Sequence, residues 1–193
     1  MVFILCGRTG VGKTTIYKEL LKKPELELTP IVPCTTRPMR EDEEEGVDYY
    51  FMDKDTFLQK QVNKEFMEST AFTVASGETW YYGSYIDSYK RKEGDKLVIL
   101  NADSIEEVVE KCKKIKVKTC VIHIHCKESA IYDRLVKRKD NYAEVKRRVA
   151  ADTEAYKKVK PYFNHEVDVS RASKGRAATM VKRIIVQERK WND

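Results

Sequence analysis

Apolar and polar positions follow two different rhythms along this chain. Short runs rich in Val and Ile predict β-strands at Val2–Cys6, Leu97–Leu100, Thr119–His125 and Glu166–Val169. Longer segments with apolar residues three and four apart predict helices at Thr14–Lys23, Ser104–Lys114, Lys127–Lys137, Tyr142–Val159 and Gly175–Lys190. Because these strands alternate with helices, the pattern predicts an α/β fold, with a central parallel sheet flanked by helices on both faces.

Residues 34–84 depart from this rhythm. They are dense in Tyr, Phe and Trp and contain one short helical pattern, Lys54–Val62. The remainder favours short, antiparallel strands joined by turns. We therefore expect one domain whose core comprises residues 1–33 and 85–193, with a mixed α+β lobe inserted at 34–84. The acidic run Glu41–Glu45 inside this lobe is expected to form a solvated loop.

The segment after the first predicted strand has the spacing of a phosphate-binding loop. It reads Gly7-Arg8-Thr9-Gly10-Val11-Gly12-Lys13-Thr14, which fits G-x-x-x-x-G-K-[ST] at every fixed position. Glycines let successive backbone N–H groups point into one concavity at a helix N-terminus, where an anion binds. We expect the segment from Gly7 to Thr15 to bind ATP, with Lys13 on the β- and γ-phosphates and the Thr14 hydroxyl on Mg²⁺.

Composition narrows the choice of partner and compartment. The 193 residues carry a net charge of +6, but the Lys/Arg-Gly-aromatic pattern of RNA-binding sheets is missing. Phosphate-bearing small molecules therefore explain the charge better than nucleic acid does. Five cysteines without a C-x-x-C pair indicate free thiols in a reducing compartment, and no apolar run is long enough to span a membrane. These features favour a cytoplasmic protein, either a monomer or a homodimer.

A series of motifs in and after the inserted segment resembles the guanylate kinase family. The motifs are Thr35-Thr36-Arg37-Pro38-Met39-Arg40, Gly46-Val47-Asp48-Tyr49-Tyr50-Phe51, Glu65-Phe66-Met67-Glu68 and Tyr81-Tyr82-Gly83-Ser84, with arginines continuing to Arg148. The resemblance implies the P-loop NTPase fold, a short lid at about residues 138–147, and a nucleoside monophosphate kinase. Such an enzyme converts ATP and GMP (or dGMP) to ADP and GDP (or dGDP) with the help of Mg²⁺.

The resemblance also implies roles for individual residues. The substrate-binding positions would be Cys34, Arg37, Arg40, Tyr49, Glu68, Tyr82, Ser84 and Asp103. The catalytic positions would be Lys13, Arg37, Arg134, Arg138 and Arg148. The chemistry agrees, since guanidinium groups bind phosphate bidentately and arginines stabilise the charge of a transferring phosphoryl group. A carboxylate at Glu68 would accept both donors on one edge of guanine, which adenine does not offer.

Departures from the family pattern leave two points open. The acceptor is open because of Cys34 and of the segment Thr73–Trp80, which is longer than usual, and the hold on hydrated Mg²⁺ is open because of Asn101. Cys34 stands where the family has serine, and Asn101 stands where it has the first aspartate of a D-x-D motif. One alternative is a kinase of the same fold that acts on another nucleotide or on a phosphorylated sugar. Another is a binding module with weak catalysis, although the intact phosphate loop argues against it.

Overall fold

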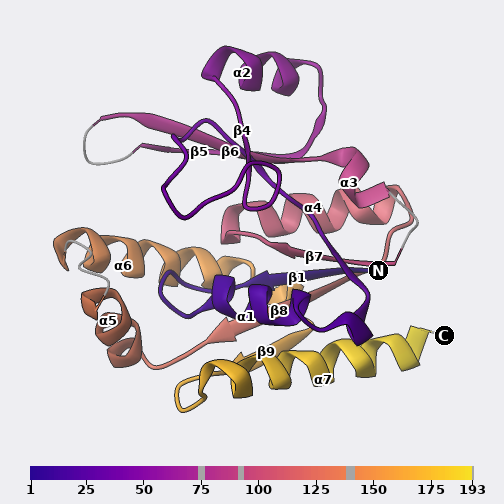
Figure 1. Ribbon diagram of the computed structural model, residues 1–193, viewed down its shortest axis with the longest axis vertical. Coiled ribbons are helices and arrows are strands. Elements are labelled where there is room, and N and C mark those ends of the chain that lie inside the picture. The colour runs from indigo at the N-terminus through magenta and orange to yellow at the C-terminus, as the bar shows by residue number, and fades with distance from the viewer. Residues whose placement is uncertain (74–76, 91–93, 138–141, 193) are drawn as a thin grey trace.

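A five-stranded parallel sheet forms the centre of the molecule. The computed structural model describes residues 1–73, 77–90, 94–137 and 142–192. The strand order is β2-β7-β1-β8-β9, and every neighbouring pair is parallel (Figure 1). The strands are β1 (Val2–Cys6), β2 (Leu28–Pro30), β7 (Asp95–Ile99), β8 (Thr119–His125) and β9 (His165–Asp168). The predicted parallel sheet is confirmed, and β2 is an additional edge strand.

Helices cover both faces of this sheet because successive strand residues point to opposite sides. Phe3 and Leu5 of β1 join one apolar cluster, and Val2 and Ile4 join the other. The first cluster includes side chains from α1 (Lys13–Leu21), α5 (Glu128–Lys137) and α7 (Lys174–Asn192). The second includes side chains from α4 (Ala102–Lys114) and the later part of α6 (Tyr142–Lys158). Two short 3₁₀ turns, η1 (Pro24–Leu26) and η2 (Lys160–Tyr162), lie in connections.

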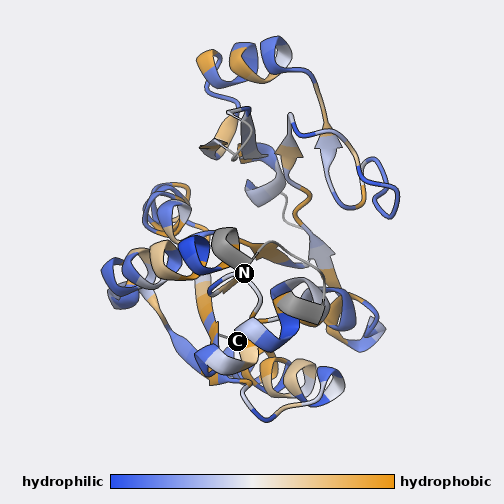
Figure 2. Cartoon of the chain, turned by 90° about the vertical axis from the view of Figure 1, so that its left-hand side faces the viewer, coloured by the Kyte–Doolittle hydropathy of each residue, from blue (hydrophilic) through white to orange (hydrophobic). Residues whose placement is uncertain are grey.

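A second sheet forms a lobe above the core (Figure 2). Its strand order is β4-β3-β6-β5. The elements are β3 (Cys34–Thr35), β4 (Tyr50–Phe51), α2 (Lys54–Val62), β5 (Phe66–Thr73) and β6 (Thr79–Tyr85), after which α3 (Ile86–Lys90) leads back to the core. β6 pairs antiparallel with β3 and β5, as expected, but β3 and β4 are parallel, which the expectation of antiparallel strands missed. Phe57 of α2 stacks on Phe66 with ring centroids 4.6 Å apart, which fixes the helix against the sheet.

No helix within the described ranges combines the length and the apolar character needed to cross a lipid bilayer.

The turn after β1 requires a glycine. Gly7 has a φ of 144°, and a β-carbon at this position would overlap the carbonyl oxygen of Ile124 on β8. β1 is paired with β8 along its whole length, and Ile124 is also paired with Val167 of β9, so this carbonyl group is not free to move aside. The chain therefore leaves the sheet here only because residue 7 has no side chain.

We predict that Gly7→Ala destabilises the protein by more than about 2 kcal/mol, because backbone strain and overpacking add. Gly175→Ala is the control: Gly175 lies in the first turn of α7, and a β-carbon there would meet nothing within 4 Å. That change should leave the free energy of unfolding within about 0.5 kcal/mol or raise it slightly. Urea denaturation measures both. Equal effects of the two substitutions would contradict the assigned constraint.

Candidate functional site

A cavity of about 530 Å³ lies between the core and the lobe. The core contributes residues of α1 and the segment after β7, and the lobe contributes β5, β6 and the loop before β4. The polar lining residues are Thr14, Tyr17, Lys18, Lys22, Asp48, Tyr49, Glu68, Thr70, Tyr82, Asn101 and Ser104. The cavity lies at the carboxyl ends of β2 and β7, beside α1, at the edge where open α/β sheets bind ligands.

The predicted phosphate loop connects β1 to α1 at this edge. Gly10 and Gly12 have φ values of 76° and 99°, and Gly12 is the N-cap of α1. The Lys13 ammonium turns back over the loop and donates to the carbonyl oxygens of Gly7 at 2.5 Å and Arg8 at 3.2 Å. Thr14 is exposed and lines the cavity. The predicted residues from Gly7 to Thr15 thus form the turn after β1 and the first turn of α1, which together have the geometry of an anion site.

A carboxylate on α6, which the sequence analysis missed, accepts a hydrogen bond from the backbone of this loop. Asp152 Oδ2 accepts the backbone N–H of Thr9 at 2.6 Å. Burial lowers the pKa of Lys13 to about 8, while Asp152 acts in the opposite direction and Arg148 adds to the lowering. No local sequence signal distinguishes Asp152, because its position follows only from how α6 packs on the loop.

Two arginines, one within the loop and one on α5, connect the loop to the elements around it. Arg134 on α5 donates to the carbonyl oxygen of Val11 at 2.8 Å. Arg8 donates to the carbonyl oxygen of Cys126 at 3.0 Å and to Thr153 Oγ1 at 3.2 Å. These contacts satisfy the carbonyl oxygens of Val11 and Cys126 and join the loop to α5, α6 and the end of β8.

The three arginines predicted to be catalytic have different positions. Arg134 contacts the loop, and Arg148 is exposed on α6 near Lys13. Arg138 lies outside the described residues, as do residues 139–141 of the predicted lid; residues 142–147 form the start of α6. The lid and the roles of these arginines remain predictions.

The predicted phosphate-binding arginines of the lobe are held by an acidic side chain. Arg37 is buried, and its guanidinium forms an ion pair with Glu43 Oε1 at 2.6 Å. The other oxygen of Glu43 accepts the backbone N–H of the exposed residue Arg40 at 2.9 Å. The expectation that the acidic run is merely solvated is therefore wrong for Glu43. A carboxylate binds here in the manner in which a phosphate oxygen would bind.

Two tyrosines connect this anion site to the cavity. The guanidinium of Arg37 lies over the ring of Tyr49 at 5.4 Å from the ring centroid. Tyr49 in turn meets Tyr82 edge to face, with centroids 6.1 Å apart, and both tyrosines line the cavity. Lys13 and Arg37 themselves turn toward their protein partners, while their neighbours Thr14 and Tyr49 face the open space.

Glu68 is a buried carboxylate with both oxygens held. Only 6% of the residue is exposed. Ser84 Oγ donates to Oε1 at 2.9 Å, and Ser104 Oγ donates to Oε2 at 2.8 Å. Burial raises the pKa of Glu68, although the two hydroxyl groups partly offset this effect. The carboxylate is thus fixed in direction at the wall of the cavity, ready to accept donors from a ligand.

Ser104 is a second residue that the sequence analysis missed. The predicted residue Asp103 is exposed, and among the described residues the cavity is lined by Ser104 and Asn101 rather than by Asp103. α4 begins at Ala102, so its helical phase turns Ser104 toward Glu68. The sequence signal that could have identified Ser104 is its hydroxyl group in the first turn of the predicted helix Ser104–Lys114.

Cys34 is directed away from the cavity. It is fully buried in an apolar cluster with Phe57 and Phe66. Its cross-strand partner is Gly83, where a β-carbon would approach the same two rings, so this face of the sheet looks into the lobe. Burial raises the pKa of the thiol to about 11. The structure therefore does not bring Cys34 together with the other residues predicted to bind the substrate.

Two curated proteins that are similar to this chain are both described as guanylate kinases. A guanylate kinase from Thermotoga maritima is 45% identical over 67 residues, 35% of this chain and 32% of that protein. Another from Helicobacter hepaticus is 36% identical over 104 residues, 53% of this chain and 48% of that protein. The matched segments thus span about a third to a half of the length of these curated relatives.

The fold is shared with a solved structure as well. The crystal structure of guanylate kinase from Anaplasma phagocytophilum matches with a TM-score of 0.70, covering 97% of this chain and 85% of that one at 19% identity. A family model described as guanylate kinase matches residues 1–188. The chain belongs to the guanylate kinase family.

Proposed function

We propose that this protein transfers the γ-phosphoryl group of ATP to GMP or dGMP, yielding ADP and GDP or dGDP. The observation that carries the proposal is the placement of Glu68 in the same cavity as Thr14. A base-reading carboxylate and the end of a phosphate-binding loop thus face one space. Membership of the guanylate kinase family supports the same reaction.

On the donor side, the loop from Gly7 to Thr15 holds the phosphates of ATP through its backbone N–H groups. Lys13 leaves the carbonyl oxygens of Gly7 and Arg8 to contact the β- and γ-phosphates. Arg134 and Arg148, together with Arg138, stabilise the negative charge of the transferring group. Asp152 keeps the Thr9 end of the loop in place through its short hydrogen bond.

The residues present fit a magnesium ion, which prefers hard oxygen ligands. The Thr14 hydroxyl and the Asn101 side chain both line the cavity, and Asn101 makes no side-chain capping bond to α4. We propose that Thr14 holds the ion and that Asn101 orients its water. When bound, Mg²⁺ neutralises charge on the β- and γ-phosphate oxygens.

On the acceptor side, Arg37, Arg40, Tyr49 and Tyr82 bind the phosphate of the monophosphate. Glu43 already holds Arg37 and the Arg40 backbone in a phosphate-binding arrangement, so the incoming phosphate takes over these donors. Glu68 accepts N1–H and the exocyclic amine of guanine, while Ser84 and Ser104 keep its oxygens in place. A phosphate dianion needs no general base, and catalysis consists of positioning and charge stabilisation.

The orientation of the Cys34 side chain helps to choose among the alternative acceptors. Because this thiol points into the lobe, base selection rests on Glu68 and its serines, which favours guanine over another base or a phosphorylated sugar. A weakly catalytic binding module has no use for the braced phosphate loop. We further propose a cytoplasmic monomer or homodimer without a nucleic-acid partner, in keeping with five free, buried cysteines.

A coupled assay with ATP and a panel of GMP, dGMP, AMP, CMP, UMP and a sugar phosphate tests the proposal. The wild-type protein should prefer the guanine nucleotides, and Glu68→Gln should lower kcat/KM for GMP by about 10- to 100-fold, since a charged acceptor of two hydrogen bonds is lost. The KM for ATP should not change. Glu110→Gln, an exposed change on α4, is the control.

Two outcomes would contradict the proposal. Turnover with none of the acceptors would refute the proposed kinase activity. An unchanged ratio of GMP to AMP turnover in Glu68→Gln would refute the role of this carboxylate in base selection.

The shifted pKa of Lys13 predicts that the affinity for ATP depends on pH. Its pKa in the nucleotide-free protein is about 8, against 10.5 for an ordinary lysine. Because only the ammonium form attracts phosphate, ATP affinity should fall as the pH rises through about 8. Asp152 raises this pKa, so Asp152→Asn should shift the midpoint of the fall to lower pH.

Calorimetric titration of ATP between pH 6.5 and 9.5 measures this midpoint. Glu154→Gln is the matched control, because Glu154 is exposed on the same helix and pairs with Lys157. The account of Lys13 is wrong if Asp152→Asn leaves the midpoint where it is, or if Glu154→Gln moves it equally.

A further inference from the structure

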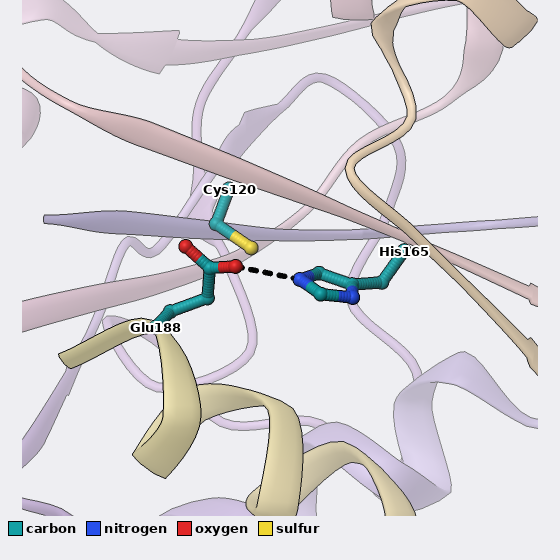
Figure 3. Close-up of side chains that lie close together, drawn as sticks. All are labelled: Cys120, His165 and Glu188. Atoms are coloured by element: carbon teal, nitrogen blue, oxygen red, sulfur yellow. Dashed lines mark hydrogen bonds and ion pairs between the residues drawn. The ribbon is translucent and has the colours of Figure 1, made fainter. Parts of the chain in front are cut away.

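Three side chains with metal-binding atoms converge at the end of the sheet opposite the phosphate loop. Cys120 comes from β8, His165 from β9 and Glu188 from α7 (Figure 3). His165 Nε2 and Glu188 Oε1 are 2.6 Å apart. The Cys120 sulfur, an imidazole nitrogen and a carboxylate oxygen all lie within 4.8 Å of one another.

Strand register and helix phase bring these residues together. His165 is paired with Ile122, which lies two residues after Cys120, so all three point to the same face of the sheet. α7 covers this face, and its Ile185 packs in the same apolar cluster as Cys120 and Ile122. Glu188 is one helical turn after Ile185 and therefore lies over the same edge.

We propose that Cys120, His165 and Glu188 form a Zn²⁺ site. Zn²⁺ is borderline-soft and is bound in proteins by thiolate, imidazole and carboxylate, usually in tetrahedral geometry. Bond lengths of about 2.0–2.3 Å place tetrahedral ligand atoms about 3.4 Å apart. The 2.6 Å contact between His165 and Glu188 needs to widen by about 0.8 Å, and the sulfur, within 4.8 Å of the other two atoms, has to approach by at most about 1.4 Å, which side-chain rotations supply.

The burial of the three residues suits an ion that enters from solvent. Cys120 is 1% exposed and forms the floor of the site. The side chains of His165 and Glu188 are 23% and 16% exposed and form its rim. A water molecule at the open side would complete four ligands.

Proton balance follows from the chemistry of the ligands. Burial, with Glu188 adding to the effect, raises the pKa of the Cys120 thiol to about 12. Coordination needs the thiolate, so binding of Zn²⁺ releases this proton to water. The neutral ring of His165 binds the ion through Nε2 and carries its one proton on Nδ1, so it releases none. No electron is transferred.

The consequence would be structural. Zn²⁺ would join α7 to β8 and to the edge strand β9, at the end of the core remote from the nucleotide cavity. The proposal is independent of the proposed kinase activity, because none of the three residues lines that cavity in the described part of the chain.

Zinc binding to the tag-free full-length protein tests the proposal. After metal stripping, Zn²⁺ is titrated in competition with a chromophoric chelator, and bound metal is counted by mass spectrometry after dialysis. Wild type should bind one Zn²⁺ tightly and unfold at a higher temperature with Zn²⁺ than with EDTA. Co²⁺ should give the charge-transfer absorption of a thiolate ligand.

Variants identify the ligands. Cys120→Ala and Glu188→Gln should each weaken Zn²⁺ binding by at least about tenfold and remove most of the thermal shift. Cys112→Ala is the matched control, because Cys112 is a buried cysteine on α4 in the opposite apolar cluster. It should bind Zn²⁺ as wild type does.

Two results would overturn the proposal. One is a wild-type protein that retains no stoichiometric Zn²⁺, in which case His165 and Glu188 are only a hydrogen-bonded pair. The other is wild-type affinity in Glu188→Gln, a change of nearly equal size at the partly exposed rim of the site, which decides the matter even if Cys120→Ala fails to fold.

Discussion

The contact between Gly7 and the carbonyl group of Ile124 is the constraint on which the site depends. Parallel pairing of β1 with β8 brings that carbonyl group against the chain at the point where it leaves the sheet. Only a residue without a side chain passes there, and the backbone then curls into the loop that ends at Gly12, the N-cap of α1. The position of Lys13 and Thr14 thus follows from sheet geometry rather than from their own interactions.

In both the core and the lobe, a carboxylate lies near a buried cationic side chain. Around the loop, Asp152 holds the N–H group of Thr9 and offsets the cost of burying Lys13. In the lobe, Glu43 holds the buried guanidinium group of Arg37. Lys13 and Arg37 therefore each have a carboxylate nearby, which offsets the cost of burying their charge. In our account, ATP and GMP exchange these internal contacts for phosphate contacts, so the site is largely pre-formed.

Much of the architecture was predictable from the sequence, because apolar periodicity is a local property. The helix over Lys54–Val62 and the strands at Val2–Cys6 and Thr119–His125 have the predicted bounds. β2 escaped notice, since it is a three-residue edge strand that ends in Pro30. The pairing of the two-residue strands β3 and β4 is likewise decided by tertiary contacts that no local pattern records.

The site was predictable where its residues are consecutive and less so where packing chooses among neighbours. Motifs drew attention to the phosphate loop and to Glu68, and the structure places Thr14 and Glu68 on one cavity. Ser104 was missed because only the phase of α4 decides that it, rather than Asp103, meets Glu68. Cys34 was expected near the base, but strand alternation places it opposite Gly83 on the inner face of the lobe. Asp152 depends on how α6 docks, which the sequence does not encode locally.

The central claim is that a donor site and an acceptor site share one cavity, and a compound that joins adenosine and guanosine through five phosphates tests it most directly. Calorimetry should show this compound binding at least about 100-fold more tightly than ATP or GMP alone. Once its adenosine part is bound, the guanosine part binds without a further loss of translational and rotational entropy. Affinity no greater than that of ATP would mean that the two sites do not face each other, and would contradict the account.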